Sequence, residues 1–165
     1  MNEWHDFFLA QAGAAGVLTG LVFVGVSINL QEIVSDPGSG LPGRAAEALL
    51  LLVAVLTVSV LLLVPGQGTI MIGVEVLAVA LAVWAWVVAI QLQRLRSWQT
   101  IRPDLRGPLM LRVALGQIAT LPSIVAGIAV LVGGLVGLYW LVAGMIFSIL
   151  VALFGAWVLL IEINR

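Results

Sequence analysis

The chain has 165 residues, of which 62% are hydrophobic and 9% are charged, and its formal net charge is −1. Soluble domains carry about a quarter charged residues, far more than the 9% of this chain. Together with a mean hydropathy of +1.22, this low charge indicates an integral membrane protein. The absence of cysteine excludes disulfides, thiolate metal sites and cysteine nucleophiles. His5 is the single histidine, which excludes a zinc site built from several histidines.

All seven basic residues are arginines, and they form no basic face of the kind that binds nucleic acid. A chain rich in Gly, Ala, Val, Leu and Arg without Lys is typical of a GC-rich bacterial genome, so we expect a bacterial inner (plasma) membrane protein. The N-terminus has no basic n-region, and its apolar stretch is too long for a signal h-region. We therefore expect no cleavable signal peptide and a first helix that stays in the membrane.

The hydropathy pattern predicts an all-α integral membrane protein that forms a single transmembrane domain over 1–165. Five apolar segments, separated by Pro/Gly turns or polar loops, are long enough to cross a bilayer. The predicted transmembrane helices span 7–30, 44–64, 69–92, 108–132 and 138–161.

The first predicted helix (7–30) carries Gly16 and Gly20 as a GxxxG pair on one face, which favours close helix packing. Gln11 and Asn29 fall on nearly the opposite face. Either this amide face packs against protein, or both amides lie near the membrane surfaces and reach water. The segment 31–43 is predicted to be a loop because it is punctuated by Pro and Gly.

The second and third predicted helices form an antiparallel hairpin, because only the tight turn 65–68 separates them. Arg44 and Glu47, three residues apart at the start of 44–64, can pair at the membrane surface. Such a surface ion pair contributes little to stability.

The third predicted helix carries a carboxylate, Glu75, inside its apolar run. At 100° per residue, Glu75 shares a face with alanines, so we expect this face to pack against other helices and to turn toward the first helix. The alanines of this seam are Ala78, Ala82, Ala85 and Ala89.

Glu75 lies roughly 9 Å below the outer end of its helix, at about 1.5 Å per residue. Gln11 is expected at a similar depth, with His5 and Asp6 just above, so these four residues form a candidate polar cluster. One interpretation is a proton- or cation-binding site. The other is a hydrogen-bonded Glu75 that fastens its helix to the first helix or to a neighbouring subunit.

The fourth and fifth predicted helices also carry faces of small residues. Pro122 is expected to kink the fourth helix. The small residues that we expect at helix–helix contacts are Gly116, Thr120, Ser123 and Gly127 in the fourth helix and Gly144, Ser148, Ala152 and Gly155 in the fifth. The turn between these helices is predicted at 133–137.

The distribution of arginines predicts the orientation. If the loop after the third helix is cytoplasmic, all seven arginines lie inside or at the inner boundary, whereas Glu3 and Asp6 lie outside. By the positive-inside rule this arrangement is N-out and C-in. Tyr139 and Trp140 would then belong to an outer aromatic belt.

The ends of the third and fifth helices resemble each other. Segments 85–94 and 156–165 match at five of ten positions, with an offset of 71 that also aligns Gly73 with Gly144. This match indicates a possible parallel duplication of a helical hairpin, 44–92 and 108–161, although a restricted membrane alphabet can also match by chance. Ile146 stands at the position that corresponds to Glu75.

Four segments resemble a family of small bacterial multi-pass membrane proteins, some of which are labelled modulator of FtsH protease. The segments are WHDFF (4–8), GLVFVGVSINL (20–30), LPGRAAE (41–47) and VPGQ (64–67), mainly in the first half of the chain. The resemblance implies a binding or regulatory role beside a membrane protease, and it supplies no catalytic residues.

The sequence therefore predicts an interaction, scaffold or regulatory protein. Its small-residue faces exceed what one five-helix bundle needs, which favours a homo-oligomer, although the same faces can also pack inside the monomer. The alternative is a small channel or transporter for protons or cations that uses Glu75. No nucleophile elbow, HExxH or phosphate loop is present in the sequence, so we expect neither an enzyme nor a cofactor. The expected partners are the lipid bilayer, further copies of the chain and another membrane protein.

Overall fold

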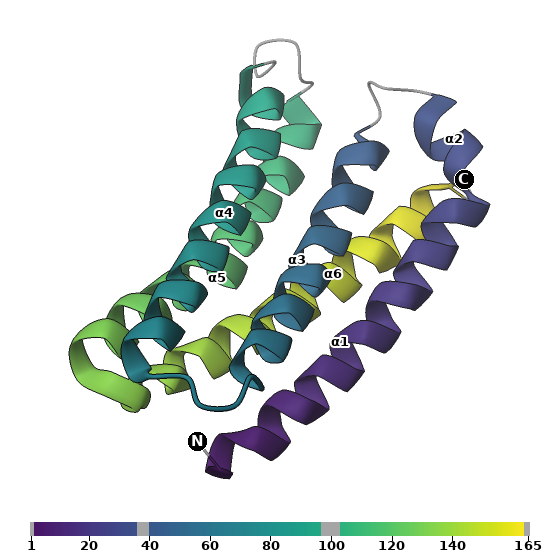
Figure 1. Ribbon diagram of the computed structural model, residues 1–165. Helices are drawn as coiled ribbons and strands as arrows, with labels where there is room; N and C mark the ends of the chain where they lie inside the picture. Colours follow the sequence, from purple (N-terminus) through teal and green to yellow (C-terminus); the bar gives the residue numbers. More distant parts are fainter. Residues whose placement is uncertain (1, 36–39, 97–102, 164–165) are drawn as a thin grey trace.

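The computed structural model describes residues 2–35, 40–96 and 103–163. These residues are helical apart from short turns, and they contain no strand. The elements are α1 (Asn2–Ile28), α2 (Leu30–Ser35), α3 (Leu41–Leu62), α4 (Thr69–Arg96), α5 (Pro103–Gly133), the 3₁₀ turn η2 (Gly134–Gly137) and α6 (Leu138–Ile163) (Figure 1).

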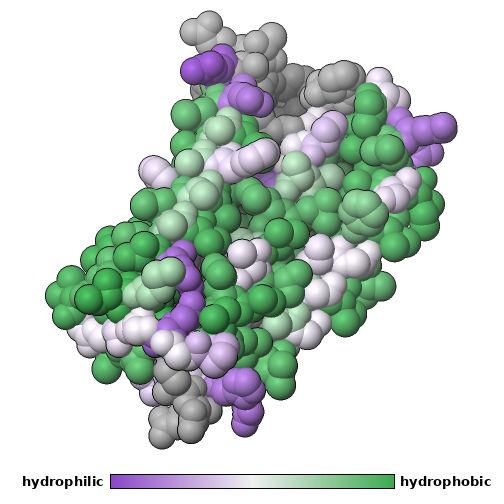
Figure 2. Space-filling view, viewed as in Figure 1, coloured by the Kyte–Doolittle hydropathy of each residue, from purple (hydrophilic) through white to green (hydrophobic). Residues whose placement is uncertain are grey.

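The prediction of an all-helical class is confirmed, and the apolar helices are compatible with a multi-pass membrane protein. In the part of the chain that is described, four helical stretches are long and apolar enough to cross a membrane. They are Trp4–Ile28, Leu41–Leu62, Thr69–Gln93 and the 53-residue Leu109–Ile161, which contains most of α5 together with η2 and α6. Hydrophobic residues cover most of the face shown in Figure 2, as expected for a surface that contacts lipid.

The helices follow one another around the molecule. α3 packs on α4, α4 on α5, α5 on α6, and α6 back on α3. α1 lies outside this group and packs mainly on α3 (Figure 1). Consequently, a large part of α1 faces away from the rest of the chain.

The segment after α1 differs from its prediction. Residues 31–35, expected to be loop, belong to helix α2, and Ile33 is buried in a small cluster with Ala45 and Leu159. The apolar contacts of Ile33 with α3 and α6 stabilise this short helix, although turn-forming residues follow it in the sequence. The rest of the predicted loop, 36–39, lies outside the described residues.

Two tight turns lie at the end of the molecule where the chain starts (Figure 1). Gly66, between α3 and α4, has φ of 80°, and Gly134 in η2 has φ of 76°; both values are in the left-handed region that favours glycine. Gly137 lies against the backbone of Ala129 and Val130, where a side chain would collide. Gly134 and Gly137 allow α5 to reverse directly into α6, and Gly66 allows the tight turn between α3 and α4. α5 itself continues as a helix through Pro122.

Candidate functional site

The predicted polar cluster is not assembled as expected. Glu75 Oε2 accepts a hydrogen bond of 2.8 Å from Gln67 Nε2 in the α3–α4 turn. His5 and Asp6 are exposed, and Gln11 is half-buried on α1. Among the described residues, no group of three or more His, Cys, Asp or Glu side chains could hold a metal ion. The hydrogen bond between Gln67 and Glu75 therefore joins α4 to the turn that precedes it.

The alanine seam of α4 faces outward. Ala78 and Ala82 are exposed, as are Ala85 and Ala89, so the prediction that they pack within the chain against α1 is wrong. The physical reason is that α4 packs on α5 and α3 through its other face. That buried face carries Ile72, Val76, Ala80, Val87 and Gln91.

The predicted packing glycines fall into two groups. Gly116, Gly127 and Gly144 are buried, and a Cβ on Gly127 would lie 2.8 Å from Leu77 Cα of α4. Gly144 lies against Ser123 of α5 in the same manner. These positions let helix backbones approach closely.

The other predicted positions differ. Ser148 is buried and donates a hydrogen bond of 3.0 Å to Ala119 O of α5. Gly16 is half-buried, and a Cβ there would lie 3.9 Å from Leu56 Cδ1 of α3. Gly20 is exposed, with no other atom within 4 Å of the place where its Cβ would be, so it does not pack within the chain as predicted. The reason is that α1 contacts the rest of the chain through one side only.

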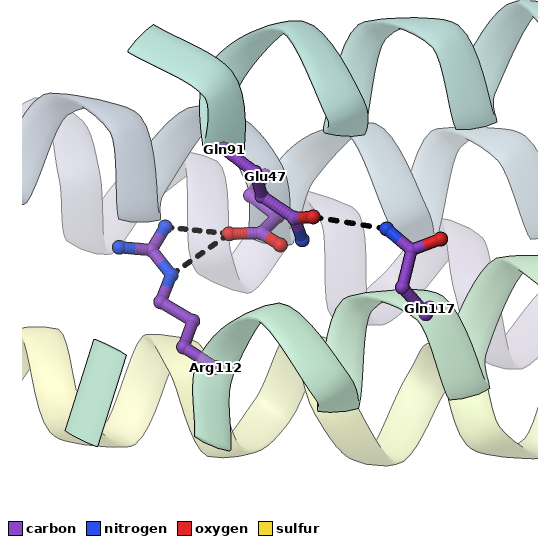
Figure 3. Close-up of polar contacts among 4 residues, drawn as sticks. All are labelled: Glu47, Gln91, Arg112 and Gln117. Atoms are coloured by element: carbon purple, nitrogen blue, oxygen red, sulfur yellow. Dashed lines mark hydrogen bonds and ion pairs between the residues drawn. The ribbon is translucent and has the colours of Figure 1, made fainter. Parts of the chain in front are cut away.

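Side chains of α3, α4 and α5 form a polar group that the sequence analysis did not assemble (Figure 3). Its member Glu47 lies near the start of α3, whereas Glu75 follows the turn at the opposite end of α3. Glu47 of α3 pairs with Arg112 of α5: Arg112 Nε and Nη2 donate to Glu47 Oε2 at 2.9 and 2.5 Å. The Glu47 side chain is 7% exposed and that of Arg112 is 20% exposed. The pair joins α3 and α5, each of which packs mainly on other helices: α3 on α1, α6 and α4, and α5 on α4 and α6.

Three further side chains continue this group into the helix bundle. Trp84 Nε1 donates a 2.9 Å hydrogen bond to Gln117 Oε1, and Gln117 Nε2 donates one of 2.9 Å to Gln91 Oε1. Gln91 Nε2 is buried without a hydrogen-bond partner. Gly116 leaves room here, because a Cβ on it would press on Gln91 Nε2 and lie 3.1 Å from Glu47 Oε1. Together these side chains connect α3, α4 and α5.

A cavity of about 260 Å³ opens beside the ion pair. It lies between α3, α5 and α6, and its polar lining residues are Arg44, Glu47 and Arg112. The rest of the lining is apolar or glycine: Ala48, Leu51, Leu111, Leu115, Val151, Phe154, Gly155 and Val158. Charge at one end and apolar wall elsewhere suit an amphiphilic molecule better than a hydrophilic substrate.

The polar group could be found from sequence only in part. Glu47 and Arg112 both stand inside predicted helices, where a charge requires a partner. They are 65 residues apart, however, so helical spacing does not relate them, and Arg44 is a nearer candidate partner for Glu47 in sequence. No protein-family model, curated protein or solved structure matches the chain.

Proposed function

We propose that the protein is a bacterial inner-membrane interaction protein that associates with further copies of itself through the exposed alanine face of α4. The observation that carries this proposal is the contrast between the two faces of α4. Ile72, Val76 and Val87 are buried inside the chain, whereas the alanines at 78, 82, 85 and 89 are exposed and form a strip of small side chains between larger exposed residues such as Leu81 and Trp86. An alanine face gains little from lipid, but it lets a second helix approach closely.

The outer side of α1 supports the same proposal. Gly13 and Gly20 are exposed there, and neither has another atom within 4 Å of its missing Cβ. Two helices thus present small residues outward, on surfaces that the chain does not itself cover. A scaffold or regulatory role beside another membrane protein would use the same kind of surface.

The proposed topology has five spans, N-out and C-in, with α5 and α6 crossing separately. In its support, α5 and α6 pack on each other and are joined by the short turn η2, as two successive spans would be. The described ends that carry arginine, the starts of α3 and α5 and the end of α4, lie together, and the end of α6 lies near them (Figure 1). Positive charge at one end favours the cytoplasmic side there.

The duplication is proposed on a similar basis. If α3–α4 and α5–α6 are related hairpins, the contact of α4 with α5 corresponds to that of α6 with α3, and both contacts occur. Ile146, the counterpart of Glu75, is exposed.

The alternative, a proton or cation pathway through Glu75, has weaker support. Glu75 is engaged by Gln67 at the turn, whereas the buried charges Glu47 and Arg112 lie at the far end of the helices. A pathway would need to connect these two ends.

Cross-linking tests the proposed association, because the chain contains no cysteine. Ala82→Cys in native membranes or lipid vesicles should give a cross-linked dimer with a short bifunctional thiol reagent. Ala114→Cys is the matched control, an exposed alanine on α5 outside the seam. Ala82→Leu should lower the dimer fraction in single-molecule photobleaching, whereas Ala114→Leu should not. Equal cross-linking at both positions, or an unchanged dimer fraction in Ala82→Leu, would overturn the proposal.

A further inference from the structure

A small cavity lies at the centre of the helix group, where α3, α4, α5 and α6 meet. Its volume is about 30 Å³, and its wall is apolar except for the hydroxyl side chains of Thr120 and Ser123 on α5 and Ser148 on α6. Thr120 is eleven residues from the start of the apolar stretch at Leu109. At about 1.5 Å per residue this is roughly 16 Å, so the cavity lies near the middle of a hydrocarbon core of about 30 Å.

Two of these hydroxyl groups have used their hydrogen within the protein. Thr120 Oγ1 donates a hydrogen bond of 2.9 Å to Gly116 O, and Ser148 Oγ donates one of 3.0 Å to Ala119 O. Both side chains are buried, at 3% and 6% exposed. A hydroxyl oxygen has two lone pairs besides its single hydrogen, so both oxygens can still accept a hydrogen bond.

Ser123 supplies the complementary donor. Its Oγ has no hydrogen-bond partner among the residues that the structure describes. A helical serine can donate to the carbonyl four residues earlier, which for Ser123 is Ala119 O, but Ser148 donates to this oxygen instead. Ser123 Oγ points toward α6, because a Cβ built on Gly144 would collide with it. Gly144 and Ser148 are one helical turn apart on α6, so Ser123 and Ser148 face the same space.

We propose that this cavity binds one water molecule that joins α5 to α6 in the middle of the apolar span. The water accepts a hydrogen bond from Ser123 Oγ and donates its two hydrogens to Thr120 Oγ1 and Ser148 Oγ. This arrangement gives every hydroxyl group in the cavity wall a partner, and buried waters typically make about three hydrogen bonds.

The size and charge of the cavity select water over other ligands. A cavity of at least ~10–15 Å³ can contain one water molecule, and the volume of about 30 Å³ meets this requirement. Sites for small organic molecules are usually ~300–1,000 Å³, so a lipid chain or a substrate does not fit. None of the described residues that line the cavity is charged, which favours a neutral ligand over an ion.

The test is water-to-protein polarisation transfer in solid-state NMR, on the full chain with isotope-labelled serine in lipid vesicles. We expect fast transfer to Cβ of Ser123 and Ser148. Ser59 is the internal control, because it is a fully buried serine on α3 that donates to Val55 O and does not line the cavity. Transfer to Ser59 should be slow.

Two variants remove the water in different ways. Ser123→Ala breaks no hydrogen bond within the described part of the chain, yet it should slow transfer to Ser148 to the rate seen at Ser59. Ala80→Val adds two methyl groups at a residue that lines the cavity and should have the same effect by displacing the water. Ser59→Ala is the matched control and should leave transfer to Ser148 unchanged.

Three results would overturn the proposal: equal transfer to Ser59, Ser123 and Ser148; unchanged transfer to Ser148 in either Ser123→Ala or Ala80→Val; or serine resonances that shift with added sodium ions, which would indicate a cation in place of water. Circular dichroism and size-exclusion elution establish that each variant is folded. Cross-linking of Ala82→Cys is measured separately, so the absence of the water does not decide the proposed self-association.

Discussion

Arg112 on α5 donates two hydrogen bonds to a single carboxylate oxygen of Glu47 on α3, although α3 and α5 each pack mainly on other helices. Each residue would be costly alone, because an unpaired charge inside an apolar span has neither water nor a counter-charge. As a pair, Glu47 and Arg112 fasten α3 to α5 across the helix group. The pair therefore has a structural role whatever occupies the cavity beside it.

Removing one partner should destabilise the fold more than removing both. Glu47→Leu or Arg112→Leu should each lower the free energy of unfolding by about 3 kcal/mol, because the remaining charge is buried without its partner. The double variant should lose less than either single variant, because it leaves no charge buried without its partner. Unfolding in mixed SDS micelles, followed by tryptophan fluorescence, measures this. Additive losses would contradict the coupling.

Adding one methyl group at the α4–α5 contact should be costly. In Gly127→Ala the new Cβ would lie 2.8 Å from Leu77 Cα, a backbone atom that cannot move without separating the helices. We expect a loss of about 1–3 kcal/mol from overpacking. Gly20→Ala is the control: nothing lies within 4 Å, so it should be neutral or slightly stabilising through helix propensity. Thermal denaturation in detergent compares the two, and equal midpoints would contradict the close packing.

Glu75 should act through its hydrogen bond, not its charge. Glu75→Gln keeps an oxygen that can accept from Gln67 Nε2, so stability should change little, whereas Glu75→Leu should lose about 1 kcal/mol by leaving the Gln67 amide without this acceptor. The same unfolding assay measures both variants. Proton or cation flux into reconstituted vesicles is the decisive companion measurement: flux in the unmodified protein that disappears in Glu75→Gln would restore the transport alternative.

Single cysteines should report the five-span topology. The described residues Thr69 and Val136 are exposed near the two turns, and Ser35 and Arg96 are exposed at the opposite end. In intact cells stripped of their outer membrane, an impermeant maleimide should label Thr69→Cys and Val136→Cys, while Ser35→Cys and Arg96→Cys should react only after lysis. Labelling of Thr69→Cys and Val136→Cys on different sides would exclude the hairpin arrangement.

The sequence predicts the helices well but not their contacts. Hydropathy locates the apolar helices because each needs a long uncharged run. It does not indicate which face of α4 is buried, since Ile72 and Ala78 are both compatible with lipid and with a protein interior. The periodicity correctly places the alanines on one face, but the choice of partner for that face depends on how α1 and α5 pack.

The polar group illustrates a second limit. Gln117 and Gln91 lie on different helices, 26 residues apart, and their bond depends on the register of α4 against α5. Proximity in sequence favours Arg44 as the partner of Glu47, whereas Arg112 is far away in sequence and comes close to Glu47 only in the tertiary structure. The helix at Leu30–Ser35 is missed for a similar reason, because its buried Ile33 contacts residues far along the chain.

The tight glycine-containing turn η2, which joins α5 to α6, also bears on how the protein is inserted into the membrane. Between Arg112 and Glu162 the chain has no ionisable side chain except Tyr139, so the hairpin can enter the bilayer without moving a charged group through it. The α3–α4 hairpin must carry Glu75 to the far side, and charged residues at the centre of an inserting helix cost about 2.5–3.5 kcal/mol. Biogenesis of the two hairpins should therefore differ: the second can insert by hydrophobicity alone, whereas the first must also move the carboxyl group of Glu75 through the bilayer.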